Sequence, residues 1–282
     1  MTIHMTEHRG HPRGGPGFLV HSIDLQAHEV HASPVIALDD FRVEGRPFPP
    51  HPHAGFSAVT YVFEDSPGGL RSGDSLGNDI CVGPGGIVWT QAGHGVMHHE
   101  VPAHRDRQLH GAQIFVNISA RHKLLEPKTF WLDGPDVPEW NSSHGDRVRV
   151  VVGRFASLAS PLTPAEDFTL LDLEIQNQVN LDLLPGQYAL LYVAAGEALV
   201  SSAQLPPELI LASGGAASMR GSGRISISAS PSARLLFLAG QELHEPVVMN
   251  GPFIMNTRAD IVDAAKRFEA GQMGDLAPLP ND

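Results

Sequence analysis

The chain has 282 residues, of which 42% are hydrophobic, so it is long enough to form two domains with a substantial core. The net charge is −12 with histidine counted as neutral, and no cluster of lysine or arginine offsets it locally, which argues against direct nucleic-acid binding. A single cysteine, Cys81, and the lack of a signal-like or membrane-spanning apolar run exclude a disulfide framework and predict a cytoplasmic protein without membrane contact.

The N-terminal leader, residues 1–17, is polar and rich in glycine and proline. We expect its histidines, His4, His8 and His11, to be exposed and without a role. Residues 18–36 show a short, mixed pattern that fits one or two strands.

Brief β-rich runs follow at 57–63, 86–91 and 111–118, separated by glycine, proline, asparagine and aspartate. Short strands at this spacing, with almost no helical periodicity, predict an all-β sandwich or barrel. Trp89 and Phe56 flank the most histidine-rich part of this region. We expect them to pack in the core, and stacking on a ligand is the alternative.

The stretch 126–146 is richer in proline, aspartate, glycine and serine, and we interpret it as a linker. A second series of β-rich runs follows it, at 148–153, 168–175, 187–196, 209–213, 224–229 and 234–240. The chain therefore reads as two similar β domains in tandem, 1–135 and 136–282.

A helix is predicted over 259–272, because four apolar residues share one helical face: Ile261, Ala264, Ala265 and Phe268. Residues 256–258 are suited to cap its start, and Gly271 to end it. We expect this helix to pack on a barrel, and a partner-binding amphipathic helix is the alternative. Cys81 is expected to be a buried apolar residue and not a redox sensor.

The segment GRPFPPHPHAGF contains the pair His51–His53 at the mouth of a predicted strand. Residues i and i+2 of a strand point to the same face, so both imidazoles are expected to face inward together. Pro50 and Pro52 suit a strand start, where a missing N–H costs little.

The segment AGHGVMHHEVP repeats this spacing with His98 and Glu100. The intervening His99 should point to the opposite face, so we do not include it among the ligands. His94 lies between two glycines in an expected loop, where it is either a solvated residue or part of the rim of the site.

Three imidazoles and one carboxylate form a mixed nitrogen and oxygen donor set. Such a set suits Fe(II), Mn, Ni, Cu or Zn and disfavours the all-oxygen sites of Ca and Mg. Four protein ligands leave room for a substrate on a six-coordinate ion, whereas a structural zinc is usually closed and tetrahedral. The pattern therefore predicts one divalent transition metal per chain, bound by His51, His53, His98 and Glu100.

Longer strings carry a family resemblance. The run HPHAGFSAVTYVFEDS, the run VGPGGIVWTQAGHGVMHHEVP and the later LAGQELHEPVVMNGPFIMNTRADI resemble the pirin family, whose members are bicupins. The resemblance implies two tandem cupin (jelly-roll) β-barrels with a short C-terminal helix. It implies a single metal, usually iron, in the N-terminal barrel and the same four ligands, and a C-terminal barrel without metal.

One residue departs from the family pattern. Many cupins and pirins carry a glutamate after the second histidine, with three residues between the two, and here Ser57 occupies that position. In pirins this glutamate is not a metal ligand, so we expect the metal site to persist while a contact in the pocket differs.

The resemblance also implies a reaction. Several pirins are similar to quercetin 2,3-dioxygenases, so we expect an oxidoreductase that uses Fe(II) and O₂ to open the ring of a small, flavonol-like aromatic enol. Glu100 would be its catalytic general base as well as a ligand. Two alternatives remain open: a redox-responsive regulatory protein that binds a protein partner through its metal-containing barrel, and an enzyme acting on another small enolisable substrate. The oligomeric state is not indicated.

Overall fold

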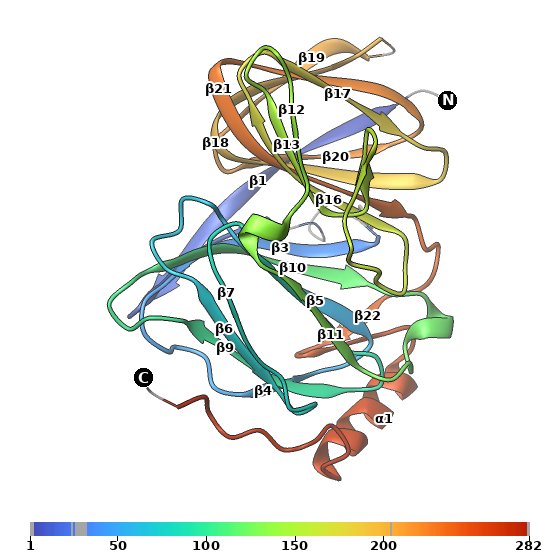
Figure 1. The fold of residues 1–282 in the computed structure, drawn as a ribbon. Coiled ribbons are helices and arrows are strands. Elements are labelled where there is room, and N and C mark those ends of the chain that lie inside the picture. Colours follow the sequence, from blue (N-terminus) through green and yellow to red (C-terminus); the bar gives the residue numbers. More distant parts are fainter. Residues whose placement is uncertain (1–2, 24, 26–32, 204, 281–282) are drawn as a thin grey trace. The chain divides into compact units, whose positions relative to one another are not determined.

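A computed structural model describes residues 3–23, 25, 33–203 and 205–280, and within them β-strands dominate (Figure 1). The described residues contain one α-helix, α1 (Arg258–Glu269), and two short 3-10 helices, η1 (Ala120–His122) and η2 (Gly134–Asp136). The predicted all-β fold with a short C-terminal helix is confirmed. No helix in the described part of the chain is long and apolar enough to cross a membrane.

The chain forms two compact units. Among the described residues, unit A comprises those of Pro12–Val20, Ala37–Asp136 and Leu243–Asp282, and unit B those of Met1–His11, His21–Ile36 and Val137–Glu242. The division into 1–135 and 136–282 therefore differs from the structure at both chain ends. The N-terminal residues join unit B because β1 (His4–Gly15) pairs with β20 (Gly215–Arg220), and the C-terminal residues join unit A because α1 packs there.

Unit A holds the strands of the first predicted domain. The strands β11-β8-β5-β10-β3-β2-β1 are neighbours in this order and form one end of the largest sheet. A separate sheet has the order β4-β9-β6-β7. The strands β1, β2 and β3 also have residues in unit B. Their bounds are β1 (His4–Gly15), β2 (Phe18–Ile23), β3 (Val35–Val43), β4 (His51–His53), β5 (Phe56–Val62), β6 (Leu70–Asp74), β7 (Asp79–Val82), β8 (Ile87–Gln91), β9 (Val96–Pro102), β10 (Leu109–Asn117), β11 (Lys128–Leu132), β22 (Val248–Asn250) and β23 (Phe253–Met255).

Unit B is built around a large apolar core on the strand order β20-β18-β21-β16-β13-β12, with β17 beside β21 and β19 beside β18. Residues of β17 alternate strictly between exposed and buried, as expected for a strand with one face on the core. The bounds are β12 (Glu139–Asn141), β13 (Arg147–Val152), β14 (Arg154–Phe155), β15 (Leu158–Ala159), β16 (Phe168–Ile175), β17 (Gln178–Leu183), β18 (Gln187–Ser202), β19 (Leu205–Ala212), β20 (Gly215–Arg220) and β21 (Gly223–Gln241).

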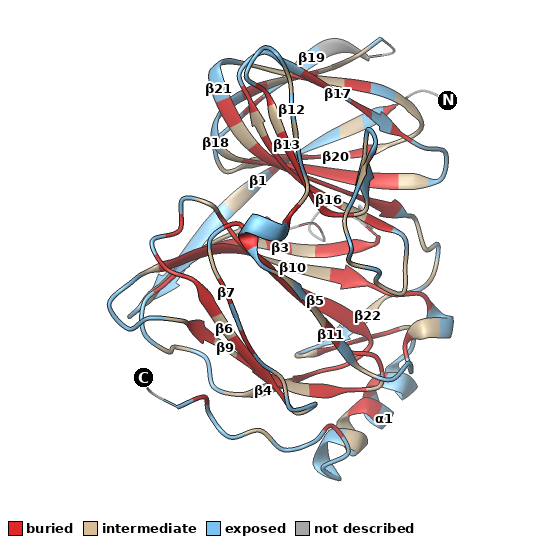
Figure 2. Ribbon diagram, viewed as in Figure 1, coloured by how far each residue is buried: buried red, intermediate tan, exposed pale blue. Residues whose placement is uncertain are grey.

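Burial explains why the central strands of unit A are apolar on both faces. Every residue of β5 is buried (Figure 2). Its neighbours β10 and β8 are buried along most of their length. The polar residues on these strands, which include Thr60 and Gln113, therefore stand out from their surroundings.

Helix α1 begins as predicted. Thr257 is its N-cap and forms a capping box with Asp260, so this part of the prediction is confirmed. Ile261 and Ala264 are buried against β23, but Phe268 is 42% exposed, so the apolar face is narrower than predicted. The helix ends at Glu269, two residues before Gly271.

Three expectations about local structure are wrong. The expected linker 126–146 contains β11 and β12, which pair with β8 and β13. The leader forms β1, and His8 within it is buried with Nε2 2.8 Å from Ser218 Oγ. Cys81 is exposed on β7 and not buried.

Candidate metal centre

Two adjacent strands bring the histidines together. His51 of β4 lies directly opposite His98 of β9, so their side chains share one face at close range. His53 stands two residues further along β4 on the same face. The three ring centroids are 4.5 to 4.8 Å apart, and one nitrogen from each ring lies within 4.8 Å of the others.

The electrostatics of the cluster keep the imidazoles neutral. Burial lowers the pKa of His98 well below its ordinary value and that of His53 to about 3, and each of these rings is disfavoured as a cation by a neighbouring histidine. Burial also lowers the pKa of His51. All three rings therefore present lone pairs at neutral pH, which metal coordination requires.

The orientation of the rings fits a metal ion. Nδ1 of His51 is 2.9 Å from the carbonyl oxygen of Pro49 and donates to it, which leaves Nε2 with its lone pair. That Nε2 is 3.0 Å from Nε2 of His98. Two nitrogens held about 2.1 Å from one ion at a right angle would be about 3.0 Å apart, and at a tetrahedral angle about 3.4 Å. The separation matches neighbouring ligands of a six-coordinate ion.

The convergence of the rings provides a second test. Each of the three imidazoles offers one nitrogen, and these nitrogens lie within 4.8 Å of one another although two of the three side chains are buried. Three neutral imidazoles brought together in this way are a common donor set for a divalent transition metal, so the residues present fit a bound metal.

Glu100 lies on the same strand face but outside the histidine cluster. It follows His98 by two residues in the direction away from His53, so the His51–His98 pair stands between Glu100 and His53. Thr60 Oγ1 donates to its Oε2 at 2.6 Å, and Ser72 Oγ is 3.4 Å from Oε1. Burial raises the pKa of Glu100 to about 7, against the lowering effect of these hydroxyls.

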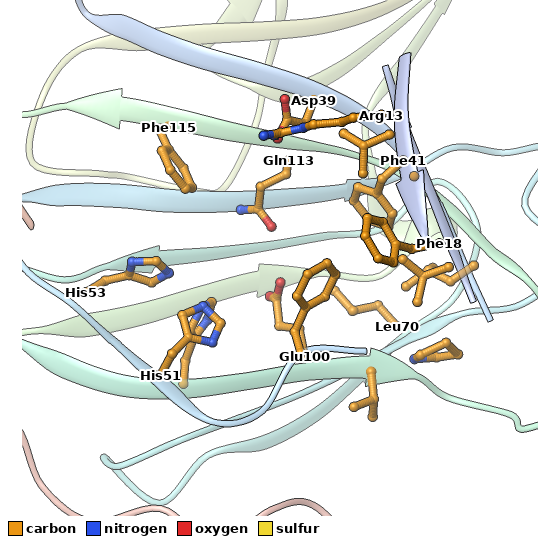
Figure 3. Close-up of a pocket in the computed structure, with 18 residues that line it drawn as sticks. Arg13, Phe18, Asp39, Phe41, His51, His53, Leu70, Glu100, Gln113 and Phe115 are labelled. Atoms are coloured by element: carbon orange, nitrogen blue, oxygen red, sulfur yellow. The ribbon is translucent and has the colours of Figure 1, made fainter. Parts of the chain in front are cut away.

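The cluster opens into a cavity of about 480 Å³ that Figure 3 shows in close-up. Most of its wall is apolar, and its polar lining includes Arg13, Asp39 and Gln113, none of which the sequence analysis singled out. The apolar lining residues are Phe18, Val20, Phe41, Val43, Phe48, Leu70, Val101, Pro102, Leu109 and Phe115. A cavity of this size and lining is typical of small-molecule sites.

The other two histidines of the segment AGHGVMHHEVP, His94 and His99, lie outside the cluster. Nε2 of His99 is 3.1 Å from the Phe48 carbonyl, and its Nδ1 accepts from the Leu279 amide at 3.0 Å, so this ring faces away from the other three. His94 is partly exposed, and its Nε2 lies 3.1 Å from Glu126 Oε2. It does not line the cavity.

The C-terminal segment braces the outer side of β9. The Met97 amide donates to the Met273 carbonyl at 3.2 Å, and Leu279, itself buried, is held by His99 as described. The Arg46 guanidinium donates to the carbonyls of Leu279 and Pro280. These contacts fix the strand that carries His98 and Glu100.

Phe56 and Ser57 face opposite sides of β5. Phe56 is fully buried, and its ring makes a T-shaped contact with His53, with centroids 5.0 Å apart, and a tilted contact with Phe115, with centroids 4.7 Å apart. Ser57 is buried but does not line the cavity, so its replacement of the family glutamate does not alter the cavity wall directly. Trp89 is 2% exposed and packs in the core, as predicted.

Comparison with known proteins adds a family context. A model of the family Pirin matches residues 9–116, and a model of the Pirin C-terminal cupin domain matches residues 169–274. A Pseudomonas aeruginosa protein named "Putative quercetin 2,3-dioxygenase PA3240" is 32% identical over 277 residues, which cover 94% of this chain and 95% of that protein.

Solved structures show the same architecture. A quercetin 2,3-dioxygenase from Acinetobacter baumannii superimposes with a TM-score of 0.83 at 26% identity, covering 95% of this chain and 97% of that one. The bacterial pirin YhhW from Escherichia coli, solved in complex with nickel(II), has a TM-score of 0.66 at 17% identity, covering 85% of this chain and 100% of that one. At 17% identity, the match to YhhW supports the fold alone.

Proposed function

The chain belongs to the pirin family, and on this premise we propose that it is a metal-dependent dioxygenase acting on a flavonol-like aromatic enol such as quercetin. The family match confirms the predicted cupin architecture. The observation that carries the proposal is the cluster of three neutral imidazoles, with one carboxylate further along the same strand face, beside an aromatic-walled cavity.

We propose that His51, His53 and His98 hold one divalent transition metal, Fe(II), and that Glu100 is the fourth ligand. When bound there, such a metal would supply Lewis acidity to a substrate oxygen and redox chemistry toward O₂. The neutral state of the three rings and the 3.0 Å separation of two ligand nitrogens support this assignment. The same donor set accommodates other divalent ions. The proposal that these residues bind a metal is therefore separate from the proposal that the metal is iron.

Glu100 is placed to accept a proton from the substrate. Its carboxyl lines the cavity, where it can accept a proton from an enolic hydroxyl of a bound substrate. Thr60 holds the carboxyl in one orientation through its short hydrogen bond. Glu100 thereby combines the roles of ligand and general base that the resemblance implies.

The apolar walls position the substrate and exclude water. Phe115 contacts the edge of His53 at 5.8 Å between ring centroids, and Phe41 lies further along the cavity (Figure 3). Planar aromatic rings pack favourably against such side chains. A flat, aromatic enol therefore fits the cavity better than a flexible polar molecule.

Anaerobic loading with Fe(II), followed by O₂ and quercetin, tests the proposal. We expect loss of flavonol absorbance and release of carbon monoxide, and at least a hundredfold slower turnover in His53→Ala, because losing a metal ligand costs metal affinity and activity of about that order or more. His104→Ala is the matched control, since His104 is exposed and lies outside the cavity.

Absence of turnover in the loaded wild-type protein would contradict the enzymatic proposal. The regulatory alternative then gains weight, and it predicts capture of a protein partner that differs between the Fe(II)- and Fe(III)-loaded forms.

A further inference from the structure

The cavity has a second polar end that the proposed reaction leaves unused. Arg13 and Asp39 line the same cavity as the histidines, and Figure 3 shows them beyond Gln113 as seen from His53. Phe18 and Phe41 lie beside this pair in the same view. The cavity therefore offers polar groups at two separate places with aromatic surface between them.

Arg13 is carried by a hairpin tip that is fixed in place. β1 and β2 are neighbouring strands, and Gly15 at the end of β1 lies so close to Phe18 at the start of β2 that an added Cβ would be 2.8 Å from the Phe18 ring. The ring of Phe18 packs in turn on Phe48, with centroids 5.4 Å apart. At the turn, the Gly17 carbonyl accepts from the Glu44 amide at 2.7 Å. These contacts fix the backbone that presents Arg13 to the cavity.

Most of the Arg13 guanidinium is open to a ligand. Its Nη2 is 2.8 Å from Asp39 Oδ2, and the side chains of the two residues are 64% and 25% exposed. This contact uses one of five N–H donors, and an exposed ion pair of this kind is weak. An anionic ligand can therefore bind the remaining donors without a large cost.

The charge of the lining gives Arg13 a distinct role. It is the one lysine or arginine among the described residues that line the cavity, in a chain whose net charge is −12. The planar guanidinium also matches a carboxylate geometrically, with two parallel hydrogen bonds.

We propose that Arg13 is a specificity-determining residue, which selects aromatic enols that carry a carboxylate or an ionised phenol on the end remote from the enol. The inference rests on the proposed function of the cavity and defines the substrate class more narrowly. Asp39 opposes this selection by competing for Arg13 and repelling the anion.

A matched pair of probes tests the proposal: 3-hydroxyflavone-4′-carboxylate and its methyl ester, which differ in charge at one end. Binding to the metal-loaded protein is measured without O₂ by the change in flavonol fluorescence. We expect the wild-type protein to prefer the carboxylate by about threefold, as one exposed, charge-assisted contact provides. The ratio falls to about one in Arg13→Gln, rises in Asp39→Asn and decreases with added salt.

Arg9→Gln is the control for loss of a positive charge on the same strand, since Arg9 is exposed and does not line the cavity. It should keep the wild-type ratio. Thermal unfolding of each variant checks that the fold is intact.

An unchanged ratio in Arg13→Gln would overturn the proposal, and so would failure of both probes to bind. Admission of O₂ afterwards separates this inference from the proposed function. Selective binding without turnover leaves the role of Arg13 standing and contradicts the dioxygenase, whereas turnover with equal preference in Arg13→Gln contradicts the role of Arg13 alone.

Discussion

At the scale of single residues, the best-defined polar contact outside the metal centre is the buried amine of Lys123. Its Nζ donates to the Asn117 side chain and to the carbonyls of Gly55 and Ile254. Burial lowers the pKa of Lys123 to about 8, against the opposing effect of Glu245 and Asp260. Three acceptors match the three protons of an ammonium group, so the charged form is held at neutral pH.

Lys123→Met should therefore destabilise the protein. Three acceptors lose their donor, and leaving buried polar groups unsatisfied predicts a loss of about 2–4 kcal/mol in the free energy of unfolding. Urea denaturation measures it. Lys266→Met, at an exposed helix position, is the control and should stay within about 0.5 kcal/mol of wild type; an equally small change in Lys123→Met would show that the amine is dispensable.

The sequence predicted individual site residues where local spacing was sufficient. His51, His53, His98 and Glu100 follow from the alternation of two short strands, and the structure brings the three histidines together. It leaves Glu100 on the same face but outside their cluster, and its place as a ligand stays a prediction. Arg13 could not be found in this way, because its position depends on strand pairing with residues outside its own segment.

Gln113 gave a signal that was overlooked. It stands between the apolar residues Ala112 and Ile114 of β10, and its Oε1 lies 3.1 Å from Thr60 Oγ1 inside unit A. A polar residue within a buried strand indicates a lined cavity or a hydrogen-bond network.

At the scale of elements, the sequence predicted the bounds of strands with long apolar runs closely, but it did not predict the strands made mostly of polar residues. The predicted run 168–175 coincides with β16, because both the core and the strand neighbours favour the same residues there. β1 was missed because most of its residues are exposed and it lacks the alternation that marks a half-buried strand. The predicted runs 224–229 and 234–240 form one long strand, β21, which continues through the polar residues between them.

Turns between these elements contribute to stability through buried side chains. Asp146 precedes β13 and is 1% exposed. Its Oδ1 accepts from the amides of Gln176 and Asn177, in the turn between β16 and β17, and its Oδ2 from Ser142 Oγ. Burial alone would raise the pKa of Asp146, but these hydrogen bonds outweigh it and the pKa is lowered.

A lowered carboxyl pKa gives a definite pH dependence. The unfolded chain takes up a proton at Asp146 before the folded protein does, so the stabilisation is present at neutral pH and is lost as the pH falls through the folded pKa. Asp146→Asn should lower the thermal midpoint at pH 7, and its deficit relative to wild type should shrink below about pH 4. Asp106→Asn, in an exposed loop, is the control; a deficit that is constant with pH would contradict the role of the charge.

At the scale of the whole molecule, the family and the two-barrel plan were predictable from long sequence strings, but the assignment of the chain ends was not. Residues 243–282 belong with unit A because α1 and Leu279 find apolar partners there. These contacts join segments separated by about 180 residues, for which local pattern carries no information. The same long-range contacts brace β9, so the C-terminal segment of the chain supports the strand that carries His98 of the candidate metal centre.

Quantitative metal analysis of the purified protein tests the proposed metal centre most directly. We expect one equivalent of a divalent transition metal, iron, per chain after loading, and its loss in His53→Ala and His98→Ala, while His99→Gln retains it because His99 faces away from the cluster. Retention of one equivalent in His53→Ala and His98→Ala, or no metal in the loaded wild-type protein, would contradict a metal centre built on these histidines.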